Sequence, residues 1–209
     1  QRQMCIRDRL KDLPEKIEEN VFARLDGEQM QLYDAYATRM KEMLSQQNEK
    51  EFHKGRMQIL SELTKLRQLC CDPALVYENY EGGSAKLDLC IELIQSAVES
   101  GHKILLFSQF TSMIEILTAR LQEESISCFV LQGSTKKEQR AQMVEQFNRD
   151  DTSVFCISLK AGGTGLNLTG ADIVIHYDPW WNVAVENQAT DRAPVSYTHL
   201  RAHETLSDL

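Results

Sequence analysis

The sequence predicts an α/β fold in which helices flank a parallel sheet, preceded by a helical hairpin that lies outside the sheet. From residue 104 onward, short apolar runs alternate with helical segments, which favours a parallel sheet covered by helices. Residues 26–71, in contrast, contain no proline and are helical in composition throughout. With 42% hydrophobic and 26% charged residues, the composition is ordinary for a globular protein.

The hairpin is predicted from composition and periodicity. A first helix is expected from Asp26 to about Gln46, after an extended linker that contains Pro14. A second helix is expected to end at about Cys71, before an Asp-Pro pair. Its apolar face is formed at helical spacing by Ile59, Leu63, Leu66 and Cys70.

A boundary is predicted at residues 77–83, where Asn79 and two glycines interrupt the pattern. Ser84 is expected to cap a helix that ends at Gly101. The predicted strands of the sheet are Ile104–Phe107, Cys128–Leu131, Val154–Ile157 and Ile173–Tyr177. Two of the helices between them are expected to begin with the capping sequences Ser112–Glu115 and Thr135–Glu138.

Each predicted strand is followed by a loop with residues suited to binding a ligand, and three of the four loops contain glycine, serine or threonine. These loops are Ser108–Thr111, Gln132–Thr135, Leu159–Gly165 and Tyr177–Asn182. Taken singly, each loop is more simply interpreted as a turn or a helix cap. Because the carboxyl ends of parallel strands lie at one edge of a sheet, the four loops together predict a site for an anionic ligand.

The ordered series of motifs from residue 13 to residue 193 resembles the second motor lobe of SWI/SNF-type ATP-dependent DNA translocases, in helicase superfamily two. The segments that carry the resemblance are Leu13–Glu18, Leu63–Leu75, Ser84–Lys86, Phe107–Phe110, Leu131–Thr135, Ser158–Leu168 and Gln188–Arg192. The resemblance implies a RecA-like fold. It also implies that residues 10–83 form the inter-lobe linker and helical protrusion, and residues 84–193 the C-terminal helicase lobe.

The resemblance further implies a role for individual residues. Contacts with the backbone of one DNA strand are expected from Ser108, Gly133, Ser134, Thr135, Lys160, Gly163 and Thr164. Gly165, Asn167 and Asp191 are expected near ATP. Gln188 and Arg192 are expected to act in catalysis, because an arginine there stabilises charge on the transferred phosphoryl group. The adjacent Trp180 and Trp181 are expected to pack rather than to stack on a base.

The function that the resemblance implies is ATP-driven movement along double-stranded DNA, with remodelling of a DNA-bound protein. ATP and Mg²⁺ would be bound mainly by a first motor lobe, which this sequence lacks. The sequence has no G-x-x-x-x-G-K-[ST] loop, and Val195 stands where the family has a second arginine, so this fragment is expected to be inactive. Alternatives are a strand-separating helicase and a non-catalytic α/β module that binds DNA or protein.

Charge and cysteine content restrict these interpretations. The net charge of −8 argues against general binding to polyanions, although a local basic surface still binds phosphates. The six cysteines form no CxxC pair, so we expect no metal site and a reducing, cytoplasmic location. No apolar run approaches the length of a membrane span, and no membrane partner is expected. The compact lobe suggests a bacterial source, with the protein acting at the nucleoid.

The two ends of the chain carry related segments. Residues 4–8 can be encoded by ATG TGT ATA AGA GAC, and the reverse complement of that sequence encodes residues 195–199. The pair resembles translated adaptor from a sequencing library, so we interpret residues 1–9 and 194–209 as artefact and exclude them from the predicted fold. His199 and His203, which have the spacing of a metal-binding pair on a helix, are excluded with them.

Overall fold

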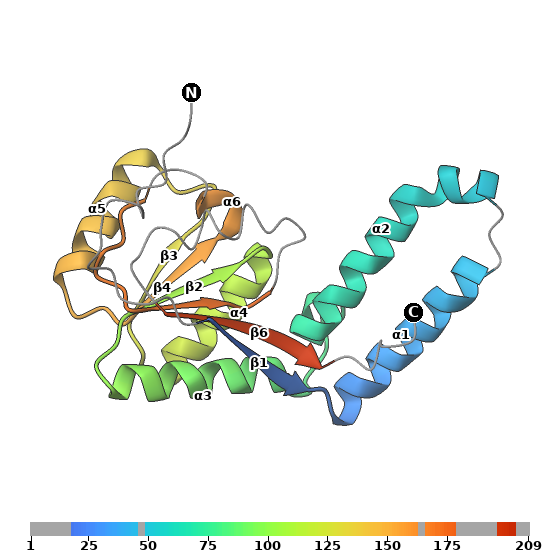
Figure 1. The fold of residues 1–209 in the computed structure, drawn as a ribbon, viewed down its shortest axis with the longest axis horizontal. Helices are drawn as coiled ribbons and strands as arrows, with labels where there is room; N and C mark the ends of the chain where they lie inside the picture. The colour runs from blue at the N-terminus through green and yellow to red at the C-terminus, as the bar shows by residue number, and fades with distance from the viewer. Residues whose placement is uncertain (1–17, 46–48, 163–165, 179–195, 204–209) are drawn as a thin grey trace.

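The computed structural model describes residues 18–45, 49–162, 166–178 and 196–203 (Figure 1). In chain order the elements are β1 (Glu18–Arg24), α1 (Gly27–Ser45), α2 (Glu49–Cys71), the 3₁₀ turn η2 (Pro73–Leu75), α3 (Ala85–Glu99), β2 (Ile104–Ser108), α4 (Thr111–Glu123), β3 (Cys128–Leu131), α5 (Lys137–Arg149), β4 (Val154–Ser158), α6 (Leu159–Gly162), β5 (Ile173–His176) and β6 (Ser196–His203). The predicted α/β fold with a preceding helical hairpin is confirmed. Among these described helices, none is long and apolar enough to cross a membrane.

The sheet has six strands in the order β1-β6-β5-β2-β4-β3, and every pair of neighbours is parallel. Strands β2 and β4 are buried along their whole length, because each carries apolar side chains on both faces. Ile104 pairs with Val154 on one side and with Ile173 on the other, so the central strands start level with one another. All four predicted strands are present.

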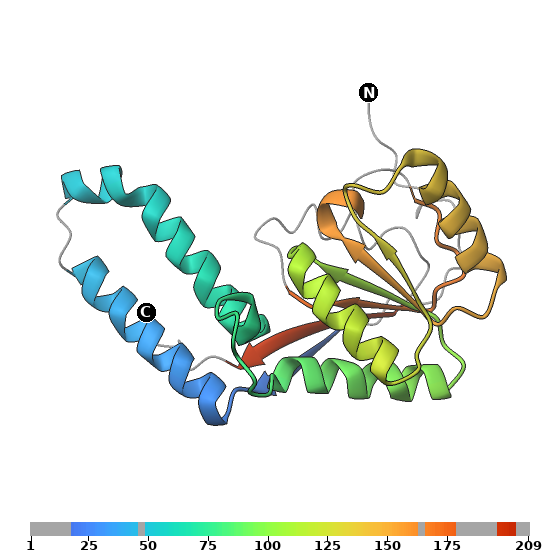
Figure 2. The same ribbon diagram turned by 180° about the vertical axis from the view of Figure 1, so that it is seen from behind.

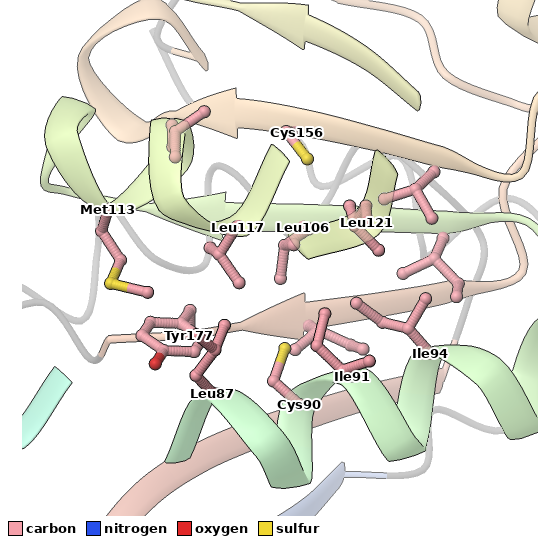
Figure 3. Packing of buried hydrophobic residues seen from close by; sticks show 14 of the residues in the cluster. Leu87, Cys90, Ile91, Ile94, Leu106, Met113, Leu117, Leu121, Cys156 and Tyr177 are labelled. Carbon is pink, nitrogen blue, oxygen red and sulfur yellow. The ribbon is translucent and has the colours of Figure 1, made fainter. Parts of the chain in front are cut away.

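Helices cover both faces of this sheet. On one face, α3 and α4 pack against side chains of β2, β4 and β5 (Figure 3). The labelled side chains in that layer are Leu87, Cys90, Ile91, Ile94, Leu106, Met113, Leu117, Leu121, Cys156 and Tyr177. On the other face, Phe147 of α5 packs on Phe155 of β4, with ring centroids 5.2 Å apart. The alternate residues of each strand therefore serve two separate hydrophobic layers.

The hairpin of α1 and α2 projects away from one end of the sheet (Figures 1 and 2). Its inner face buries Tyr33, Leu66 and Cys70, and Leu25, just before α1, packs in the same cluster. The buried amide of Gln29 joins the hairpin to α3. Its Nε2 donates to the Leu69 carbonyl at 2.9 Å, and its Oε1 accepts from the Ala85 N–H at 3.2 Å. The base of the hairpin is therefore fixed to the sheet domain by polar contacts as well as by packing.

The helix starts agree only in part with the predicted caps. Ser84 caps α3 as predicted, and its hydroxyl accepts from the Leu87 N–H at 3.4 Å. The other two caps were wrong, because Phe110 and Lys136 occupy the N-cap positions of α4 and α5 and neither makes a side-chain cap bond. Ser112 lies inside the first turn of its helix. The hydroxyl of Thr135 instead accepts from the Gln132 N–H at 3.1 Å, within the preceding turn.

Two strands of the sheet were not predicted. Strand β1 lies in the segment that the sequence assigned to the linker, where charged residues hide the alternation of a strand. Strand β6 is formed by residues 196–203, which were excluded as adaptor. It lies between β1 and β5 and pairs with both in parallel.

Candidate nucleic-acid interface

The four predicted loops begin at one edge of the sheet. Strands β5, β2, β4 and β3 are neighbours in that order and run parallel, so their carboxyl ends lie along one edge. These ends are His176, Ser108, Ser158 and Leu131.

The turn after β3 is closed by its own hydrogen bonds. The Thr135 N–H donates to the Gln132 carbonyl at 3.1 Å, and the Thr135 hydroxyl accepts from the Gln132 N–H. Gly133 and Ser134 are exposed at the tip. A Cβ at Gly133 would meet no atom within 4 Å, and the Gly133 φ is not left-handed. Nothing in the described fold requires glycine there, whereas a ligand that approaches the backbone closely would.

Helix α5 begins directly after this turn. No side-chain hydrogen bond caps its N-terminus, and Lys136 and Lys137 are exposed beside it. The N–H groups of a first helical turn carry a partial positive charge and lack partners in the helix itself. Their position next to two lysines makes this end of α5 favourable for an anion.

The loop after β4 folds as the short helix α6, which holds the backbone of Lys160. The buried hydroxyl of Ser158 accepts from the Ala161 N–H at 3.3 Å and fixes the first turn. The remaining predicted contacts in this motif, Gly163 and Thr164, lie outside the described residues.

The side chain of Arg140 connects these two loops. Its Nε donates to the Thr135 carbonyl at 2.9 Å. One terminal nitrogen, Nη2, donates to the carbonyls of Gln132 and Gly133 at 3.3 Å each, and Nη1 donates to the Ala161 carbonyl at 3.5 Å. The guanidinium therefore bonds to the turn after β3 and to α6 at the same time. No motif in the sequence predicted a role for this residue.

On the other half of the edge, a buried carboxylate joins the loops after β5 and β2. Asp178 is 2% exposed, and both of its oxygens accept from the Gln109 N–H at 3.1 Å. Burial raises the pKa of Asp178, and the hydrogen bond from Ser108 and the charge of Lys86 oppose that shift. Ser108 is fully buried, so its hydroxyl does not face solvent as a DNA contact requires.

Lys86 and Arg67 extend this buried polar group toward the hairpin. The ammonium of Lys86 lies 5.0 Å from the centroid of the Tyr177 ring, and the Tyr177 hydroxyl donates to the Cys71 carbonyl at 2.8 Å. Arg67 of α2 donates to Gln109 Oε1 at 3.2 Å. The loops at this end of the edge are thus bonded directly to the protrusion.

A groove of about 880 Å³ runs along α5. Arg140, Val144, Leu166 and Asn167 are among its lining residues. Asn167 is exposed, and its carbonyl accepts from Asn148 Nδ2 at 3.0 Å. The residues expected to form a nucleotide site with Asn167, namely Gly165, Gln188, Asp191 and Arg192, lie outside the described residues, as do Trp180 and Trp181.

Comparison with known proteins identifies the family. A model of the helicase conserved C-terminal domain matches residues 85–194, and a model of the SNF2-related domain matches residues 2–75. The structure resembles the SWI2/SNF2 ATPase C-terminal domain of Sulfolobus solfataricus, with a TM-score of 0.74 and 32% identity over 90% of this chain and 80% of that one. The chain belongs to the SWI2/SNF2 family.

The predicted RecA-like second lobe is thereby confirmed. This SNF2 lobe also resembles the Sulfolobus solfataricus SWI2/SNF2 ATPase core in complex with double-stranded DNA, with a TM-score of 0.79 and 30% identity over 95% of this chain and 43% of that one. It is 41% identical over 189 residues to a putative ATP-dependent helicase/translocase of Bacillus subtilis, covering 87% of this chain and 20% of the relative. An uncharacterized ATP-dependent helicase of Mycoplasma pneumoniae is 39% identical to this chain. The match covers 88% of this chain and 18% of the relative. The chain thus spans about a fifth of the length of these relatives.

Proposed function

We propose that this lobe is part of an ATP-dependent translocase on double-stranded DNA, and that the turn after β3 with the start of α5 holds the phosphate backbone of one strand. The observation that carries the proposal is the pairing of Gly133 with an N-terminus of α5 that has no side-chain cap. Glycine leaves space for a phosphate beside the backbone, and the free N–H groups and nearby lysines are donors for it. These contacts position the lobe on DNA without reading its sequence.

The remaining assignments follow from family membership. We infer that Lys160, Ser134 and Thr135 contribute to the same grip, with Gly163 and Thr164 next to it. Gln188 and Arg192 would act on ATP and Mg²⁺ held mainly by the first motor lobe, with Gly165, Asn167 and Asp191 nearby. Closure and opening of the cleft between the lobes would then move the two DNA grips alternately along one strand.

The Gly133→Ala substitution in the 209-residue chain tests the DNA grip. We expect binding of a labelled DNA duplex to weaken by about 10-fold, the effect of losing roughly one charged hydrogen bond. Stability should be unchanged or higher by about 0.4–1 kcal/mol, because the added methyl group meets open space. Gly83→Ala is the matched control, since its Cβ would make only an ordinary contact, 3.9 Å from Asp88. Equal DNA affinity for both variants would reject this turn as a phosphate site.

The wider proposal is tested with the intact parent protein. We expect its ATPase activity to be stimulated by duplex DNA, and we expect the fragment alone to hydrolyse no ATP. Efficient separation of duplex strands would favour the strand-separating alternative. DNA binding without any ATPase activity in the intact protein would favour a binding module. A DNA-tracking role further leads us to propose the bacterial nucleoid as its location and a DNA-bound protein as its target.

A further inference from the structure

We infer that Arg140 is a positioning residue that sets the spacing between the two DNA-holding loops of this lobe, a role that rests on the proposed function. The loops come from different strands, β3 and β4, and the described main-chain hydrogen bonds of each lie within its own loop. Arg140 bonds to both. Its guanidinium bridges the carbonyls of the turn after β3 and the Ala161 carbonyl of α6.

The chemistry of the contact suits positioning rather than direct binding of phosphate. Four acceptors of Arg140 among the described residues are backbone carbonyl oxygens, and its Nε, Nη1 and Nη2 groups each donate to at least one of them. A planar guanidinium holds such acceptors at fixed angles, whereas a lysine ammonium has neither the fork nor the reach. Arg140 bonds carbonyls of the turn and not its N–H groups, and Gly133 and Ser134 are exposed.

The location of Arg140 couples the grip to helix α5. Arg140 lies one turn inside the helix whose N-terminus is the proposed phosphate site, and its own N–H donates to the Lys136 carbonyl at 3.0 Å. A displacement of α6 would therefore be transmitted through one side chain to the turn and to the start of α5. Two phosphate contacts on one strand require a constant separation, and Arg140 maintains it.

The test compares Arg140→Lys and Arg140→Gln in the 209-residue chain, with Arg149→Gln as the control. Arg149 lies on the same helix and lines the same groove, but it bonds Glu145 of its own helix at 2.8 Å. We expect both Arg140 variants to weaken binding of a labelled DNA duplex by about 10-fold, and Arg149→Gln to change it little. Arg140→Lys keeps the positive charge, so weaker DNA binding by this variant would be due to lost geometry and not to lost charge.

The salt dependence distinguishes positioning from direct contact. A residue that neutralises a phosphate changes the slope of log K against log salt by about 0.9 when it is removed. We expect Arg140→Gln to keep the slope of the unaltered chain, because Arg140 bonds carbonyls and not phosphate. A slope reduced by about one unit would overturn the positioning role and assign Arg140 a direct contact.

Amide hydrogen exchange in the absence of DNA tests the spacing itself. The Gln132, Thr135 and Ala161 N–H groups each have a partner within these loops. In Arg140→Lys we expect these amides to exchange faster while the amides of β2 keep their protection. Unchanged exchange would overturn the inference even if DNA binding persists. Failure of the unaltered chain to bind DNA, with faster exchange in the variant, would overturn the proposed function and leave Arg140 as a link between two loops.

Discussion

The Cys71 carbonyl at the end of α2 accepts two side-chain hydrogen bonds, and removing both should cost more than the sum of removing each. The Ser84 hydroxyl donates to it at 2.9 Å and the Tyr177 hydroxyl at 2.8 Å. Tyr177 is fully buried, and burial raises the pKa of its phenol, so it stays a donor at neutral pH. These two bonds join the hairpin to the start of α3 and to the loop after β5.

The magnitudes follow from what each substitution leaves behind. Tyr177→Phe removes one buried hydrogen bond while Ser84 still satisfies the carbonyl, so we expect a loss of about 1 kcal/mol. Ser84→Ala also removes the N-cap of α3, for a total of about 1.5 kcal/mol, because the cap bond is long at 3.4 Å. The double variant leaves a buried carbonyl without either donor. That penalty should make its loss exceed the sum by about 1 kcal/mol.

Urea unfolding followed by circular dichroism measures the free energy of unfolding of the four proteins in this cycle. Tyr177→Phe combined with Ser100→Ala is the control pair, because the Ser100 hydroxyl donates to Ser96 at an exposed helix end. Those two changes should add within about 0.5 kcal/mol. If the Ser84 and Tyr177 changes also add within that range, the reasoning about a shared acceptor is refuted.

Three further predictions concern the sheet and its thiols. Phe147→Ala should lower the free energy of unfolding by about 3–5 kcal/mol, because the ring is fully buried against Phe155, and a loss below about 1 kcal/mol would contradict that packing. Hydrogen bonding to Cys156 lowers the pKa of Cys128 to about 7, and Cys128 is the least buried of the described cysteines. Iodoacetamide should therefore modify Cys128 first at neutral pH. Mass spectrometry of peptides measures the rates, and equal rates at all described cysteines would disprove this. In a chain that ends at residue 193, hydrogen exchange should show loss of amide protection in β1 but not in β2, because β1 pairs with β6. Full protection of β1 in that chain would show that β1 keeps its place without β6.

The sequence located the central elements because burial leaves a strong pattern there. Strands β2 and β4 are continuous apolar runs, and α3 shows a clear apolar face, so their positions follow from periodicity. The predicted cap residues of α4 and α5 were wrong, because a sequence pattern shows which residues are able to cap a helix. It does not show which hydrogen bonds those residues make. Thr135 uses its hydroxyl inside the turn before the helix.

The sequence predicts where the candidate site lies and far less about its contacts. Polar loops after parallel strands are sufficient to locate a ligand edge, because the carboxyl ends of such strands lie together. Arg140 gave no signal, because its acceptors are backbone carbonyls, which every residue possesses. The buried grouping of Lys86 with Asp178 was missed for a related reason. Lys86 lies at the start of α3 and Asp178 follows β5, and charged residues at such positions are ordinarily solvated. Only the three-dimensional fold buries the two side chains near each other.

Strand β6 bears on how the ends of the chain are interpreted. The complementarity of the codons available to residues 4–8 and 195–199 predicts an adaptor origin, while residues 196–203 lie in the sheet between β1 and β5. The two observations are compatible, because a parallel ladder is made of backbone groups and accepts any segment with sufficient strand propensity. The position of residues 196–203 therefore shows that the sheet accepts a strand between β1 and β5. It does not show where this segment comes from. We expect sequencing of the encoding locus to show that residues after Ala193 continue differently and again include a strand-forming segment. A natural reading frame identical to residues 194–209 would refute the adaptor interpretation.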